Sequence, residues 1–224
     1  MYLFAHLFTG VLITLGFFYL YNDRRAFPVC IAGALLPDLL DKPLMLLLPS
    51  IFGSTRTIGH TLFLGTVLLL VGILLWSSGR SMLGIAFAGS VLSHQVLDML
   101  WTLPAVWFFP LNGMFPFTTG SGTVWHFLML ELTNPSEWVF ALASGILVIR
   151  WFMGNRVFFR PSFLSSRHPG LLLYGFSCLL CVTGAFLIIT GMNPASAPFP
   201  ALSYEPDKTL VAGFIALCGA YVFV

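Results

Sequence analysis

The stretch Ser93-His94-Gln95-Val96-Leu97-Asp98 lies inside an apolar run from about Met82 to Trp101. A run of this length and composition is typical of a helix that crosses a membrane. On a helix, His94 and Asp98 are four residues apart and therefore lie on one face. Ionisable side chains in a membrane-spanning segment are costly and usually functional. A hydrogen-bonded core pair, or a pair that joins neighbouring helices, is the structural alternative.

The composition places the whole chain in the membrane class. Of its 224 residues, 58% are hydrophobic and 8% are charged, whereas a soluble domain carries roughly 25% charged residues. The net charge of +2, without a basic cluster, gives no indication of nucleic-acid binding. Cys178 and Cys181 form a C-x-x-C inside an apolar run, where we expect packing and not metal or redox chemistry. We predict a single integral membrane domain over residues 1–224.

The apolar runs predict an all-α, polytopic membrane bundle with about seven spanning segments. In order, the runs cover about residues 2–21, 27–42, 54–76, 82–101, 137–153, 171–191 and 210–224. Pro37 is expected to break or kink the second helix. The short apolar piece 43–52 is expected to form a half-helix or an interfacial segment. Residues 1–117 carry the polar motifs, and residues 118–224 are expected to supply supporting helices.

The basic residues predict the orientation. If there are seven spans, seven of the ten lysines and arginines fall on one side: Arg24, Arg25, Arg80, Arg150, Arg156, Arg160 and Arg167. By the positive-inside tendency that side is cytoplasmic, which puts the N-terminus outside.

With this orientation, ionisable groups gather at the outer ends of the first four helices. They are His6, Asp38, Asp41, Arg56, His60, His94 and Asp98, with His126 in the outer loop that follows. Imidazoles and carboxylates at one depth are the ligands that zinc and similar divalent ions take. Without a metal, the carboxylates would need protonation or ion pairing. The sequence therefore predicts a divalent metal site in the cell membrane, toward the outer face.

Three motifs, together with the early histidine, carry a resemblance to a known family. They are G-x-L-x-P-D-x-x-D from Gly33 to Asp41, R-x-x-x-H-[ST] from Arg56 to Thr61, and H-x-x-x-D from His94 to Asp98. Residues 1–117 thereby resemble the membrane-bound metal-dependent hydrolases of the YdjM-like, LexA-binding family. That family's usual spacing is P-D-x-D, and here the spacing is P-D-x-x-D.

More remotely, the layout resembles the all-helical zinc phospholipase C and P1 nuclease group. This resemblance implies a first metal site made by Asp38 or Asp41, His60, His94 and Asp98, and a second that His6 and Asp98 help to hold. His126 and Thr61 are further candidates. One or two ions are expected, with zinc as the first choice.

The expected function is hydrolysis of a phosphoester or lipid-linked substrate at the outer face, with membrane lipid as the partner. Arg56 is the candidate catalytic residue, because its planar guanidinium can pair with a phosphate. An interfacial anchor, or a partner for Asp38 or Asp41, is the equal alternative for Arg56. Two other functions stay open: a transporter or ion pathway that uses the same His/Asp cluster, and a non-catalytic membrane protein with a structural metal.

Overall fold

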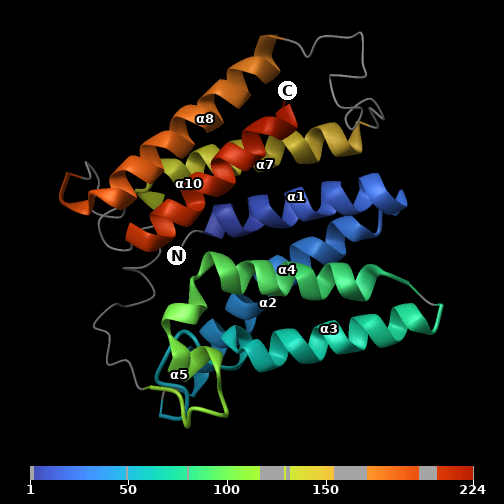
Figure 1. Ribbon diagram of the computed structural model, residues 1–224, viewed down its shortest axis with the longest axis vertical. Helices are drawn as coiled ribbons and strands as arrows, with labels where there is room; N and C mark the ends of the chain where they lie inside the picture. Colours follow the sequence, from blue (N-terminus) through green and yellow to red (C-terminus); the bar gives the residue numbers. More distant parts are fainter. Residues whose placement is uncertain are drawn as a thin grey trace. The chain divides into compact units, whose positions relative to one another are not determined.

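The computed structural model describes residues 3–48, 50–79, 81–116, 129, 132–153, 171–196 and 206–223, whose regular structure is entirely helical (Figure 1). The eight α-helices of these residues are α1 (Leu3–Tyr21), α2 (Ala26–Leu47), α3 (Leu62–Ser77), α4 (Leu83–Leu97), α5 (Pro104–Trp107), α7 (Pro135–Phe152), α8 (Leu171–Met192) and α10 (Pro206–Ala220). The short 3-10 helices are η1 (Ile58–His60), η2 (Leu100–Thr102), η5 (Pro194–Ser196) and η6 (Tyr221–Phe223). The predicted all-α class is confirmed over the described ranges.

Within the described ranges, two helices are long and apolar enough to cross a membrane: Leu3–Tyr21, which is α1, and Gly175–Met192 within α8. The helices α3 and α4 are apolar but shorter. The bundle of about seven spans and its N-terminus-out orientation therefore stay predictions.

The break predicted at Pro37 is wrong, because α2 runs through both Pro37 and Pro43, and the alternative of a kink stays a prediction. A proline inside a helix removes one backbone hydrogen bond and crowds the carbonyl four residues earlier, which costs about 3 kcal/mol. Packing of α2 against its neighbours offsets this cost. The separate half-helix expected over 43–52 is likewise wrong, since Pro43 lies in α2 and the helix ends at Leu47.

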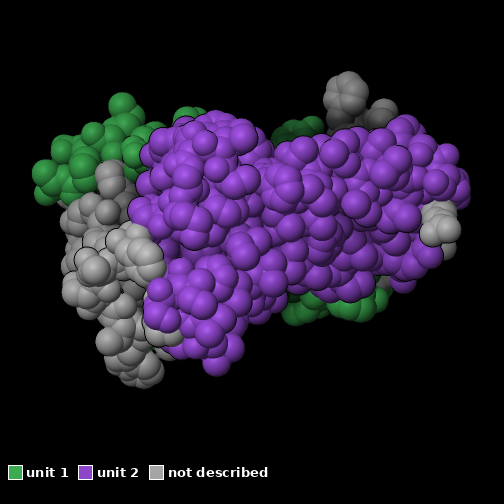
Figure 2. Space-filling model, turned by 90° about the horizontal axis from the view of Figure 1, so that it is seen from below, with its two compact units in different colours: residues 1–8, 124–224 green, residues 9–123 purple. Residues whose placement is uncertain are grey.

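The chain divides into two compact units, coloured separately in Figure 2. Unit 1 comprises Met1–Phe8 and Val124–Val224, and unit 2 comprises Thr9–Thr123. All three polar motifs of the sequence belong to unit 2.

Glycines set the packing of unit 2, in which α4 lies beside both α2 and α3. A Cβ on Gly33 of α2 would lie 2.6 Å from the carbonyl oxygen of Phe87 on α4. A Cβ on Gly72 of α3 would lie 2.7 Å from the carbonyl carbon of Gly84 on α4. Only glycine permits backbones to approach this closely, a device common where helices pack in membranes. These contacts let the N-terminal part of α4, which carries Gly84 and Phe87, pack closely against α3 and α2.

Unit 1 is organised around the pair α8 and α10, which lie side by side (Figure 1). A Cβ on either Gly184 or Gly213 would lie 2.8 Å from the carbonyl oxygen of the other glycine. Within the same unit, the buried Glu137 carboxylate accepts a 2.7 Å hydrogen bond from the backbone N–H of Phe4 in the first turn of α1. A carboxylate at this position satisfies a helix N-terminal donor and complements the helix dipole.

Candidate metal centre

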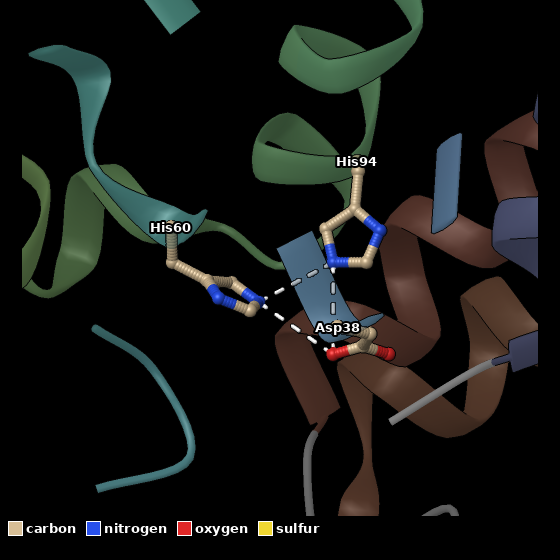
Figure 3. Close-up of side chains that lie close together, drawn as sticks. All are labelled: Asp38, His60 and His94. Atoms are coloured by element: carbon tan, nitrogen blue, oxygen red, sulfur yellow. Dashed lines mark hydrogen bonds and ion pairs between the residues drawn. The ribbon is translucent and has the colours of Figure 1, made fainter. Parts of the chain in front are cut away.

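Asp38, His60 and His94 come from three different elements of unit 2 and converge on one point (Figure 3). Asp38 lies on α2, His60 ends η1, and His94 lies in the last turn of α4. The Nε2 atoms of His60 and His94 are 3.3 Å apart. The Oδ1 atom of Asp38 lies 3.7 Å from Nε2 of His60 and 3.9 Å from Nε2 of His94. All three residues are buried.

The other nitrogen of each imidazole is committed to an acceptor. Nδ1 of His60 donates to Oδ2 of Asp41 at 2.7 Å. Nδ1 of His94 donates to the backbone carbonyl of Ala34 on α2 at 2.7 Å. Since a carbonyl and a carboxylate oxygen can only accept, both rings carry their proton on Nδ1. The two Nε2 atoms therefore face each other, and each carries a lone pair when its ring is neutral.

In the neutral rings, two facing lone pairs favour a proton or a metal cation between them. Two nitrogens bound at zinc distances with a tetrahedral angle are about 3.3 Å apart. The separation of the two nitrogens thus fits a small divalent cation, and the Asp38 oxygen lies within 4.8 Å of both, so the chain's own residues can supply two imidazoles and one carboxylate.

Asp41 lies behind His60, where its carboxylate accepts three hydrogen bonds. The backbone N–H of Thr57 donates to Oδ2 at 2.6 Å, and that of Gly59 donates to Oδ1 at 2.8 Å, in addition to the bond from His60. This arrangement requires η1 to lie against α2. A Cβ on Gly59 would lie 2.7 Å from the carbonyl oxygen of Pro37, so only glycine fits there. The carboxylate–histidine contact is the support that metal-binding imidazoles commonly have in proteins.

Asp98 lies next to the cluster and is paired with Arg56. Its Oδ2 atom is 3.6 Å from Nε2 of His60 and accepts a 3.1 Å hydrogen bond from Nε of Arg56. The carboxylate is buried, whereas the Arg56 side chain keeps 21% of its surface exposed. Asp98 is therefore a partner of Arg56 in the structure. Asp98 is the C-cap of α4, and the next residue, Met99, adopts a left-handed conformation with φ of 50°.

The electrostatic surroundings favour positive charge at His60. The carboxylates of Asp41 and Asp98 lie 2.7 and 3.6 Å from its two ring nitrogens. The same negative surroundings that attract a proton also attract a cation.

Two further residues support the cluster and were missed in the sequence. Lys42 donates from Nζ to Oδ2 of Asp38 at 2.9 Å, a contact that the D-x-x-x-K spacing on one helix could have indicated. The buried amide of Gln95 donates to the carbonyl oxygens of Thr61 at 2.8 Å and Gly59 at 3.4 Å. A glutamine next to His94 inside an apolar run is the signal that could have identified it. The sequence gives no indication that the backbone carbonyl of Ala34 is the acceptor for His94, because any residue has such a carbonyl.

The remaining predicted residues lie elsewhere or have other contacts. His6 is a buried residue of α1 in unit 1. Thr61 caps α3: its hydroxyl accepts from the Leu64 N–H at 3.1 Å and donates to the Ile58 carbonyl at 2.9 Å. His126 lies outside the described residues.

Comparison with known proteins supplies one match. The YdjM inner membrane protein family matches residues 1–162, a region that includes Asp38, His60 and His94. No curated protein and no solved structure matches the chain. The matched region covers well over half of the 224 residues. The chain therefore belongs to the YdjM inner membrane protein family.

Proposed function

We propose that this membrane protein is a metal-dependent hydrolase whose cation is held by Asp38, His60 and His94. The observation that carries the proposal is the convergence of two Nε2 atoms at 3.3 Å, with the Asp38 carboxylate beside them, while both Nδ1 atoms donate elsewhere. Two neutral imidazoles in this arrangement direct their lone pairs at one point, which suits a bound cation. Three protein ligands with room for a fourth are the pattern of catalytic zinc sites, whereas structural sites are closed by four.

The metal would supply activation of water and of the scissile bond. A bound divalent cation lowers the pKa of a coordinated water toward about 7 and polarises a phosphoryl or carbonyl oxygen. Zinc is the preferred ion because two imidazoles and one carboxylate suit it. The family match supports a membrane location, and the positive-inside pattern supports a site toward the outer face.

Asp98 is the proposed general base. Its Oδ2 atom lies 3.6 Å from Nε2 of His60, beside the cluster. This carboxylate is not among the three residues whose donor atoms all lie within 4.8 Å of one another, so we assign to it proton acceptance from an attacking water. The Arg56 guanidinium donates a 3.1 Å hydrogen bond to the same Oδ2 atom.

The proposed substrate is an anionic phosphoester, in a lipid or lipid-linked molecule. Two cations, Lys42 and Arg56, border the cluster, and both side chains are partly exposed. Positive groups beside a metal stabilise the charge that develops on a transferring phosphoryl group. Exposed apolar side chains lie nearby in sequence on α2, where Leu46 and Leu47 are 57% and 76% exposed, which suits a substrate that stays in the bilayer.

The test compares metal content and hydrolysis in two neighbouring variants. His94→Ala removes a proposed ligand, whereas Ser93→Ala removes a hydroxyl that donates to the Ser90 carbonyl at 2.7 Å, away from the cluster. The purified wild type and Ser93→Ala should each bind one equivalent of zinc and cleave an aryl phosphodiester or a phospholipid in mixed micelles. His94→Ala should lose the zinc and the activity.

Two results would contradict the proposal in different ways. Equal zinc content in His94→Ala and Ser93→Ala would remove the metal site. Zinc bound as expected, without cleavage of either substrate but with passage of zinc into proteoliposomes, would replace the hydrolase by a transporter.

A further inference from the structure

Lys42 forms an ion pair with the one carboxylate of the candidate metal centre. The pair spans one turn of α2, with Nζ of Lys42 at 2.9 Å from Oδ2 of Asp38. The Lys42 side chain is 33% exposed and the Asp38 side chain is 10% exposed, so the contact lies at the boundary between the protein interior and its surroundings. An acidic residue four positions before a lysine is the favourable orientation for such a pair.

The two oxygens of Asp38 thus face different partners. Oδ1 faces Nε2 of His60 at 3.7 Å and Nε2 of His94 at 3.9 Å, whereas Oδ2 is held by the ammonium of Lys42. A carboxylate can bind a cation through one oxygen or through both. Since Lys42 binds Oδ2, Oδ1 is the oxygen that faces a cation between the imidazoles.

We infer that Lys42 is a positioning residue that restricts Asp38 to coordination through one oxygen and so keeps one metal position open for the reacting molecule. This inference rests on the proposed function, because it requires a metal at the cluster. If Asp38 coordinated through both oxygens, its second oxygen would occupy the position that catalytic zinc sites leave to water or substrate.

An ordinary surface ion pair does not account for the placement of Lys42. Exposed pairs contribute little to stability, and an ammonium beside a cation site weakens cation binding by like-charge repulsion. A protein selected only for tight metal binding would avoid this lysine. Control over the geometry of Asp38 is a reason to have it.

The test uses cobalt, whose visible absorption weakens as its coordination number rises from four to five. The probe is Co²⁺ alone, added to the purified full-length protein. Lys42→Met removes the charge and the donor but keeps a good helix former, and Lys42→Ala provides a second route to the same loss. Lys42→Arg keeps a cation that can donate to Oδ2. The matched control is Arg25→Met, which breaks the 2.9 Å ion pair to Asp23 before the other end of α2.

The wild type, Lys42→Arg and Arg25→Met should share one intense cobalt spectrum. Lys42→Met and Lys42→Ala should bind cobalt but lose absorption intensity, and their phosphodiester turnover should fall by about 10- to 100-fold, the scale of losing a group that orients a metal ligand.

The outcomes separate this inference from the proposed function. Cobalt binding that depends on His94, with the same spectrum in the wild type and Lys42→Met, overturns the role of Lys42 and leaves the metal site standing. Absence of His94-dependent cobalt binding in the wild type overturns both. Loss of intensity in Arg25→Met equal to that in Lys42→Met also overturns the role of Lys42, because it would make the effect one of net charge.

Discussion

Replacing Asp41 by asparagine separates the residue that supports His60 from the residue proposed to bind the metal. The Asp41 carboxylate accepts three hydrogen bonds, from the N–H groups of Thr57 and Gly59 and from Nδ1 of His60. An asparagine has the same shape but only one acceptor oxygen, since its other terminal atom is an NH₂ donor. At least one of the three buried donors must therefore lose its acceptor.

The contacts indicate which bond is lost. With the amide oxygen kept toward Thr57 and His60, two bonds survive and the NH₂ group faces the N–H of Gly59, which is left unsatisfied. With the amide oxygen turned toward Gly59 instead, the hydrogen bonds from Thr57 and His60 are both lost, so this orientation is less stable. One buried unsatisfied donor costs about 1–3 kcal/mol. For a chain of this size, roughly 2–4 °C of melting temperature corresponds to each kcal/mol, so the metal-free variant should melt about 2–12 °C lower.

Metal affinity should also fall, but not vanish. A neutral amide supports an imidazole less strongly than a carboxylate does, and loss of such a partner typically weakens metal binding about 10- to 100-fold. Asp38→Asn should behave differently, because it removes the proposed ligand charge and should abolish binding. The assay measures melting temperature without metal and zinc affinity by competition with a chromophoric chelator, on both variants in the same detergent.

The reverse pattern would refute this reasoning. If Asp41→Asn abolished zinc binding while Asp38→Asn kept it, Asp41 would be the ligand. If Asp41→Asn melted and bound zinc like the wild type, the three hydrogen bonds would have no measurable role.

Three further outcomes follow from the structure. Gly33→Ala should destabilise unit 2 by about 1–3 kcal/mol through overpacking, because its Cβ would lie 2.6 Å from the Phe87 carbonyl oxygen. Gly89→Ala, with no atom within 4 Å of its Cβ, should be neutral or stabilising by up to about 1 kcal/mol. Equal melting temperatures of the two variants would contradict this prediction. Met99→Gly should stabilise by about 1 kcal/mol, because glycine adopts a left-handed φ without strain; a lower melting temperature would show that the Met99 side chain contributes more than its strain costs. Zinc affinity should fall as pH is lowered, because protons compete for the imidazoles. A pH-independent affinity between about pH 6 and 8 would be inconsistent with histidine ligands.

Hydropathy alone located most of the helices. The first run, predicted over about residues 2–21, is α1 (Leu3–Tyr21), and the run predicted over about 171–191 is α8 (Leu171–Met192). Such runs are informative because burial of apolar side chains dominates helix placement in these segments. The continuity of α2 was not predictable in the same way. The cost of Pro37 is local, whereas the close packing at Gly33 that offsets it is a tertiary property.

The residue types of the candidate site were visible in the sequence, but their roles were not. Asp38 and Asp41 are three residues apart on one helix, so periodicity places both on one side and cannot rank them. Their difference arises from η1, whose backbone donors at Thr57 and Gly59 occupy Asp41. The close approach of η1 to α2 depends on Gly59, which has no side chain that could have indicated a functional role. The contact between Arg56 and Asp98, 42 residues apart, likewise depends on how the elements pack.

Pro37 has a consequence for how the site can evolve. A proline in a helix displaces the carbonyls of the preceding turn, and the Ala34 carbonyl in that turn is the acceptor that orients His94. Replacing the proline by a better helix former would regularise α2 and strengthen it, but would draw this carbonyl back toward the helix axis and away from the imidazole. Selection for a more stable helix would therefore favour another residue at position 37, whereas selection for the function of the site would favour proline. Variants that are stabilised by replacing Pro37 should be the ones that lose the orientation of His94.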